Sequence, residues 1–376
     1  MENRAGTYVQ QLTGYRAFIP RPLPPTINYS PRLLELLSDA DTALARLDAA
    51  SDLLPNPELF VSMYVRKEAL LSSQIEGTQA SLADVLAAEA KGRQRARPFG
   101  EYFNYVRAMN HGLDTMKSLP VSLRLIREIH KVLLQGTRGG HLDPGEFRTK
   151  QNWIGASGCT LNDAKFVPPP PEQVLDHMSG LEKFLHDTAP MPLLIKAALV
   201  HCQFETIHPF LDGNGRIGRL LITLLLIWKA RLVRPVLYLS YFFKQNRQEY
   251  YDRLQAVRET GAFEDWIEFF LRGVAVAAAD GAQTARKIQE LREKHREQVT
   301  SRFQSSAAVG LLDFLFRQPV ITVAGATQSL KRSKPVANKL VAQFMEVGIL
   351  TESSGQKRNR LFRYQPYLDL FGELRP

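Results

Sequence analysis

The stretch His-Pro-Phe-Leu-Asp-Gly-Asn-Gly-Arg-Ile-Gly-Arg, residues 208–219, decides both the fold and the chemistry of this chain. A helical pattern over residues 191–207 ends at this stretch, and the apolar helical pattern that continues over residues 220–232 begins within it. Gly213 and Gly215 can adopt positive φ, so that successive amides of the turn point inward. The helix that follows adds its N-terminal amides and the positive end of its dipole. The stretch therefore predicts an anion-binding turn between two helices.

The charged side chains of the same stretch indicate what the turn binds. Arg216 and Arg219 are three residues apart in the first turn of the helix, so they share a face and form a polyphosphate site with the amides. Asp212 supplies one carboxylate, which suffices for a Mg²⁺ ion that takes its other ligands from water and phosphate. His208 can accept a proton near neutral pH.

Each part also has a plainer interpretation when taken alone. Asp-Gly-Asn-Gly is an ordinary turn sequence, and a single histidine after a helix is more often structural. A calcium loop begins in a similar way, but its fifth and sixth positions are Arg216 and Ile217 here, so an acidic ligand and a glycine are missing. A Walker A loop would need Gly-Lys-Ser/Thr, which this stretch lacks. The combination of features favours the polyphosphate site.

The twelve residues match the motif H-P-F-x-D-G-N-G-R-x-G-R at every specified position, and the chain therefore resembles the Fic family. The resemblance implies a helical bundle with a β-hairpin flap. It also implies a protein adenylyltransferase, which transfers AMP from Mg-ATP to a Ser, Thr or Tyr hydroxyl of a target protein or of itself. The implied roles are the catalytic base for His208, the magnesium ligand for Asp212, and ATP binding for Gly213, Asn214, Gly215, Arg216, Gly218 and Arg219.

A second motif lies upstream, at residues 72–77, Ser-Ser-Gln-Ile-Glu-Gly. It resembles the inhibitory motif S/T-x-x-x-E-G/N of the same family, with Ser72 and Glu76 on one helix face. The resemblance implies that Glu76 pairs with Arg219 and keeps it from the γ-phosphate. A solvated glutamate at a helix end is the plainer alternative. A third hypothesis keeps the fold and reverses the reaction, with Glu76 aligning water for de-AMPylation.

Two further elements are expected near the site. Residues 152–154 and 165–167 are short β-type pieces within a glycine-rich loop, and we predict a hairpin over residues 151–168. It resembles the family's flap, which docks the target protein by adding a strand. Tyr250 and Tyr251 resemble the aromatic element near the adenine pocket. The alternatives are a purely structural hairpin and two core tyrosines.

The rest of the chain reads as all-α. Helical patterns start at Pro31 and Pro57 and recur over residues 80–91, 101–117, 121–135, 172–187, 244–259 and 263–298. Residues 16–30 are rich in proline and are expected to be extended. We predict three units: an N-terminal helical segment with the inhibitory motif (1–100), a Fic catalytic core (101–285), and a linker helix with a winged helix-turn-helix domain (286–376).

The last unit is basic. Residues 301–376 contain eleven Lys/Arg and five Asp/Glu, a net charge of +6 within a total of +10. Helices over residues 311–316, 322–330 and 335–347, followed by strands at 349–350 and 361–364, predict a winged helix with residues 357–360 on its wing. Such a module favours DNA binding or protein docking, and a basic surface without a partner is the alternative. The rival function is therefore a DNA-binding regulator that senses ATP.

Composition limits the setting. Two cysteines do not form a disulfide framework, and the N-terminus lacks a secretory pattern, which favours the cytoplasm. The most apolar run, residues 220–228, is too short to span a bilayer, so no membrane partner is expected. Whether the chain forms a homodimer stays open at this level.

Overall fold

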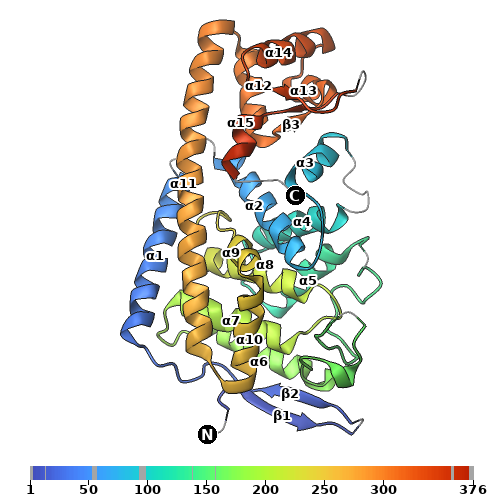
Figure 1. Cartoon of the computed structure of the whole chain (residues 1–376), viewed down its shortest axis with the longest axis vertical. Helices are drawn as coiled ribbons and strands as arrows, with labels where there is room; N and C mark the ends of the chain where they lie inside the picture. The colour runs from blue at the N-terminus through green and yellow to red at the C-terminus, as the bar shows by residue number, and fades with distance from the viewer. Residues whose placement is uncertain are drawn as a thin grey trace.

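The fold is organised along α11 (Phe263–Phe303), a 41-residue helix that runs through most of the length of the molecule (Figure 1). A computed structural model describes residues 3–12, 14–52, 57–92, 99–137, 139–156, 158–356 and 360–371. Helix α1 (Pro31–Asp52) packs along α11, and their buried leucine and alanine side chains share one core. The predicted linker helix after residue 285 is thus the continuation of a core helix.

Two helices form the centre of the predicted catalytic core. Helix α7 (Leu193–Ile207) is buried at every residue after Leu193, and α8 (Asn214–Trp228) is buried from Arg216 to Leu226. Apolar side chains on all faces suit helices that other helices surround. The surrounding helices are α4 (Gly100–Thr115), α5 (Leu123–Leu134), α6 (Val174–His186), α9 (Ser240–Gln245) and α10 (Arg247–Thr260).

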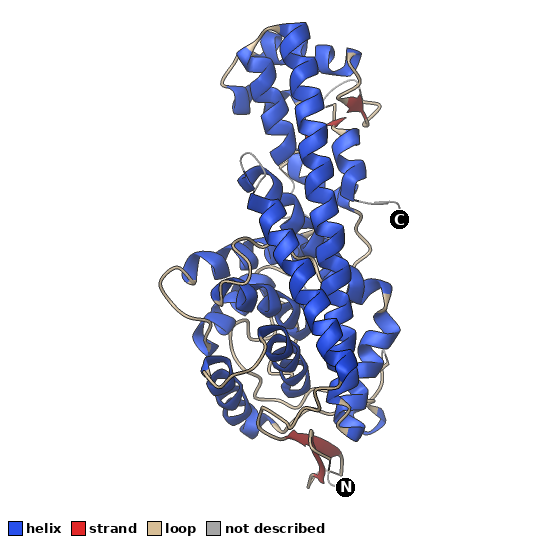
Figure 2. Cartoon of the chain, turned by 90° about the vertical axis from the view of Figure 1, so that its left-hand side faces the viewer, coloured by secondary structure: helices blue, strands red, loops and turns tan. Residues whose placement is uncertain are grey.

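The proline-rich N-terminal segment contains a hairpin that the sequence interpretation missed. Strand β1 (Gly6–Gln10) pairs antiparallel with β2 (Arg16–Pro20), and the amide of Phe18 donates to the carbonyl of Val167. Residues 16–20 are extended, as expected for the segment 16–30, but the sequence did not predict that they pair with β1. Figure 2 shows the strands of the molecule at its two ends, with this hairpin near the N-terminus.

The expected pairing within residues 151–168 is confirmed, but it is limited to one antiparallel pair. The described part of this segment has one isolated antiparallel bridge, between Ile154 and Phe166, and a short 3₁₀ helix at Leu161–Asp163. The side chain of Phe166 is 1% exposed, whereas Trp153 is 41% exposed. The buried ring of Phe166 therefore anchors this segment. Within the described part of the segment, strand pairing is limited to Ile154 and Phe166.

The C-terminal module has the element order helix, strand, helix, helix, strand, strand. These elements are α12 (Ser306–Arg317), β3 (Val320–Ile321), α13 (Val323–Leu330), α14 (Lys334–Glu346), β4 (Thr351–Glu352) and β5 (Phe362–Arg363), followed by α15 (Gln365–Leu368) and a 3₁₀ turn at Asp369–Phe371. The strands form one antiparallel sheet in the order β3-β5-β4. The predicted strand at 349–350 begins two residues later, and β3 was missed. Of the expected wing, residues 357–359 lie outside the described residues.

Helix α2 (Pro57–Ile75) connects this module to the predicted catalytic core. Near its middle, the ring of Tyr64 meets the ring of Phe371 edge-on, and Arg66 donates to the carbonyl of Arg317. Its C-terminal end carries the predicted inhibitory motif. Helix α3 (Leu82–Ala90), which begins with a Ser81–Asp84 capping box, contacts β3.

Candidate active site

The predicted anion-binding turn is built from two left-handed residues. Helix α7 ends at His208, which has φ 49° and ψ 60°, and α8 begins after Gly213, which has φ 79°. The side chain of Asn214 closes the loop between them: its Nδ2 donates to the carbonyl of Phe210 at 2.7 Å, and its Oδ1 accepts from the amide of the same residue at 2.8 Å. Asn214 therefore fixes the shape of the turn.

His208 is held by its backbone, which leaves its ring available. The carbonyl of His208 accepts from Arg148 Nε at 2.9 Å and from Asn152 Nδ2 at 3.2 Å, and the ring Nδ1 has no hydrogen-bond partner within the described residues. Burial, and then the positive charges of Arg258 and Arg148, lower the pKa of His208 to about 4. The imidazole is thus neutral at pH 7 and can accept a proton.

Asp212 suits a single Mg²⁺ ion. Its Oδ1 accepts from the amide of Gly213 and lies 3.3 Å from Arg216 Nη2, whereas Oδ2 takes no hydrogen bond among the described residues and lies beside Gly139. No group of three or more metal-ligating side chains occurs in the described chain. One free carboxylate oxygen fits an ion that draws its remaining ligands from phosphate and water.

The two arginines have different environments. Arg216 is 4% exposed, and it lies 3.3 Å from Asp212 and 3.8 Å from Glu101; its Nε and Nη1 have no hydrogen-bond partner within the described residues. Arg219 is 2% exposed, and its Nε and Nη2 donate to Ser72 of α2 and to Glu76 just after it. Arg216 therefore has donors to offer a ligand, whereas Arg219 would have to exchange partners.

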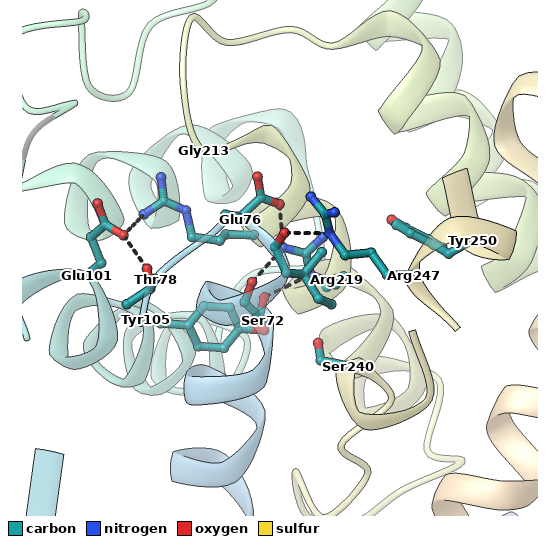
Figure 3. A network of polar contacts seen from close by, with 12 residues as sticks. Ser72, Glu76, Thr78, Glu101, Tyr105, Gly213, Arg219, Ser240, Arg247 and Tyr250 are labelled. Atoms are coloured by element: carbon teal, nitrogen blue, oxygen red, sulfur yellow. Dashed lines mark hydrogen bonds and ion pairs between the residues drawn. The ribbon is translucent and has the colours of Figure 1, made fainter. Parts of the chain in front are cut away.

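Ser72 and Glu76 converge on Arg219 (Figure 3). Arg219 Nε donates to the Ser72 hydroxyl at 2.9 Å, and Nη2 donates to the Ser72 carbonyl at 3.0 Å and to Glu76 Oε1 at 2.7 Å. Burial alone would raise the pKa of Glu76, but the charge and hydrogen bond of Arg219 lower it overall. The carboxylate is therefore ionised at neutral pH, and the predicted pair is formed.

Glu76 also occupies space at the anion-binding turn. A Cβ placed on Gly215 would lie 2.3 Å from Glu76 Oε1 and 3.0 Å from Arg219 Nη1. Glycine at this position thus permits the carboxylate to lie against the backbone of the turn. The acidic oxygen lies where an anion bound to the Gly215 backbone would approach.

A cavity of about 470 Å³ lies beside this pair. One part of its lining consists of Glu76, His208, Gly215 and Arg219. Another part contains aromatic and aliphatic side chains and one glutamine: Trp153, Ile154, Phe166, Gln248, Tyr250, Tyr251 and Leu254. Both predicted tyrosines line the cavity, although Tyr250 is 1% exposed and contributes mainly to the aromatic core, where its hydroxyl lies 2.9 Å from His201 Nε2.

One predicted residue lies elsewhere, and two residues were missed. Gly218 faces α7, where an added Cβ would lie 2.4 Å from Glu205 Oε1. Its backbone therefore allows close packing of α7 on α8. Glu205 and Arg258 both line the cavity. Glu205 lies in the last turn of α7, and no pattern in the sequence sets it apart from the other residues of that helix.

Comparisons with known proteins identify the family of this chain. A sequence model described as "Fic/DOC family N-terminal" matches residues 34–114, and one described as "Fic/DOC family" matches residues 120–226; together they span half of the chain. The chain belongs to the Fic/DOC family. Both the anion-binding turn and the inhibitory motif lie within the matched ranges.

Relatives within the family are similar to part of the chain. Protein adenylyltransferase fic-1 of Caenorhabditis briggsae is 32% identical over 171 residues, which are 44% of this chain and 29% of that protein. Protein adenylyltransferase Fic of Aedes aegypti is 34% identical over 154 residues, 40% of this chain and 27% of that protein. The chain thus aligns with less than a third of the length of either relative.

Solved structures show the same fold. A Fic family protein from Desulfovibrio desulfuricans has a TM-score of 0.56 at 22% identity, with 91% of this chain and 98% of that chain covered. Fic-1 of C. elegans, residues 134–508, has a TM-score of 0.51 at 21% identity, with 69% and 75% covered. The first of these alignments extends over nearly the whole length of both chains, so the fold of the family is confirmed beyond the two matched ranges.

Proposed function

We propose that this chain is a protein adenylyltransferase that transfers AMP from Mg-ATP to a hydroxyl group of a target protein or of itself, and that Glu76 inhibits it. The observation that carries the proposal is the 2.7 Å pair of Glu76 and Arg219 at an anion-binding turn. A buried arginine beside the backbone amides of a turn at a helix N-terminus can bind phosphate. An acidic side chain that holds this arginine competes with phosphate for it.

The remaining residues have roles that follow from their places. His208, neutral at pH 7, accepts the proton of the hydroxyl that attacks the α-phosphorus, and pyrophosphate is the leaving group. Asp212 Oδ2 would hold Mg²⁺, which would neutralise phosphate charge. Gly213, Asn214 and Gly215 shape the turn, and Arg216 and Arg219 bind phosphate. Tyr250 and Tyr251 belong to the adenine end of the cavity. These assignments rest on geometry together with the family motif.

Docking of the target protein is assigned to residues 151–168. The bridge from Ile154 to Phe166 is a single backbone pair, and Trp153 beside it is 41% exposed. An extended peptide can add to such an edge by backbone hydrogen bonds. The two cysteines, Cys159 and Cys202, are unpaired, which supports a cytoplasmic location. No helix of the described chain is long and apolar enough to cross a membrane.

The test is incubation of the purified protein with ATP labelled at the α-phosphate, followed by electrophoresis. We expect covalent label on the protein or on a lysate protein, stronger in Glu76→Gly and absent in His208→Ala. ATP binding without covalent label in both the wild type and Glu76→Gly would refute the transferase and favour an ATP sensor. Loss of label from a modified target that depends on Glu76 would favour de-AMPylation.

A further inference from the structure

Glu205 is a buried carboxyl group of the cavity that no role described above uses. It lies in the last turn of α7 and is 6% exposed, and its Oε1 has no hydrogen-bond partner within the described residues. Buried acceptors are nearly always paired, because leaving one unpaired costs stability. A carboxyl group that lines a cavity with an unused oxygen therefore points to donors supplied by a ligand.

The surroundings of Glu205 place it between the two ends of the cavity. It lies against the backbone of α8 at Gly218, next to Arg219 of the phosphate end, and its charge also acts on Tyr250. Its own carbonyl accepts from Arg258 Nη2 at 3.0 Å, so the last turn of α7 is fixed in place. Burial raises the pKa of the Glu205 carboxyl to about 7, although Arg219 and Arg258 oppose the shift.

The chemistry of a nucleoside triphosphate limits which of its groups can donate a hydrogen bond to Glu205. A carboxylate repels phosphate, so Glu205 does not bind the phosphate chain. The exocyclic amino group of adenine is a donor, but it lies at the end of the nucleotide that is most distant from the phosphates. The ribose lies between base and phosphates and carries two hydroxyl donors, and carboxylates bind vicinal hydroxyl groups of ribose in other nucleotide sites.

We propose that Glu205 binds the ribose of ATP by accepting hydrogen bonds from its 2′- or 3′-hydroxyl group, and so makes the site selective for ribonucleotides. This inference rests on the proposed function, because it needs ATP in the cavity. Gly218 is part of the same arrangement: any side chain there would displace the carboxyl group from its position against α8. The alternative is that Glu205 only balances the charges of Arg219 and Arg258.

A substrate-and-side-chain cycle separates these two roles. The parent is the full chain with Glu76→Gly, which frees Arg219, and His208→Ala, which prevents turnover. Dissociation constants for ATP, 2′-deoxy-ATP and 3′-deoxy-ATP, each with Mg²⁺, are measured by isothermal titration calorimetry on this parent and on the same chain with Glu205→Ala. Glu259→Ala is the matched control, because Glu259 is an exposed carboxylate outside this cavity.

We expect at least one deoxy analogue to bind the parent about 10- to 100-fold more weakly than ATP, which is the range for a hydrogen bond to a charged group. In Glu205→Ala, the affinity for ATP should fall by a similar factor, and the affinities for ATP and for that analogue should differ by less than about twofold. Glu259→Ala should keep the full difference in affinity. Glu205→Gln keeps the shape of the side chain and one acceptor, so it should retain part of the difference in affinity between ATP and the analogue. This variant replaces Glu205→Ala if Glu205→Ala has a low melting temperature.

The inference is overturned if the parent binds both analogues as tightly as ATP. It is also overturned if the loss for the analogue is the same with and without Glu205, which is the result expected of a charge-balancing residue. Failure of the parent to bind ATP at all is a different result, because it refutes the proposed function and this inference with it.

Discussion

Replacing Glu76 by glycine tests the inhibitory pair directly. The substitution removes the Oε1 that accepts from Arg219 Nη2 at 2.7 Å and clears the space above Gly215. Arg219 keeps its two bonds to Ser72, at 2.9 and 3.0 Å, so the guanidinium stays in place with one edge free. The variant should therefore bind the γ-phosphate without a rearrangement of the helix.

The size of the effect follows from the exposure of the pair. A hydrogen bond to a charged group contributes about 1.5–3 kcal/mol. Because the Glu76 side chain is 37% exposed, water competes for it and the lower end of the range, about 1.5 kcal/mol, applies. Since about 1.4 kcal/mol corresponds to a factor of ten, we expect roughly tenfold tighter productive ATP binding. The repulsion between the carboxylate and phosphate adds to this value.

The assay compares initial rates of α-phosphate labelling at ATP concentrations below saturation for the wild type, Glu76→Gly, Glu76→Gln and Gln79→Gly. Gln79 is an exposed residue of the same loop, so its variant controls for a looser backbone. Labelling should rise at least about tenfold in Glu76→Gly, less in Glu76→Gln, and not in Gln79→Gly. Equal rates in the wild type and Glu76→Gly, or an equal rise in Gln79→Gly, would refute the argument that the pair limits ATP binding.

Three further predictions address the base, the core and the C-terminal module. His208→Ala should lower AMP transfer by about 10²–10⁴-fold while ATP affinity changes little, because the base acts in the transition state; calorimetry that shows lost ATP binding with transfer retained would contradict this. Burial lowers the pKa of His201 to about 3, so its contribution to stability is complete above pH 6.5 and is lost as the pH falls towards 3; the melting temperature should drop over this range, and less steeply in His201→Asn. The full chain should bind duplex DNA with a strong salt dependence, and replacing the exposed Lys334 and Lys339 by serine should reduce the salt slope by about one to two; no binding at low salt would leave protein docking.

Periodicity predicted the helices well because their packing depends on a pattern within each segment. The helical patterns of the core agree with α1 to α11, apart from the short helix α9, which has too few residues to show a period. Strand β2 could not be predicted in the same way, since it is stabilised by contacts from distant parts of the chain, including Val167. The hairpin over residues 151–168 was overestimated for the same reason: two β-type tripeptides do not determine how many backbone pairs they form.

The site shows a similar division. The motif at residues 208–219 predicted the turn and the position of Arg216 and Arg219 at the start of the next helix. The spacing of Ser72 and Glu76 predicted that the two side chains share a face, which their contacts to Arg219 confirm. Glu205 escaped notice because its significance depends on a missing partner, and only coordinates can show that a buried atom is unpaired.

Helix α2 has a mechanical consequence. It is 19 residues long, so at 1.5 Å per residue it rises about 28 Å from its first residue to the end that carries the inhibitory motif, and Tyr64, which contacts the C-terminal module, lies about 10 Å from that first residue. A rigid tilt of only about 3° about its first turn would displace the far end by roughly 1.5 Å. The contact from Glu76 to Arg219, now 2.7 Å, would then exceed hydrogen-bonding distance. Any event that shifts Tyr64 against Phe371 by a fraction of an ångström would thus act on a lever whose long arm ends at the phosphate site.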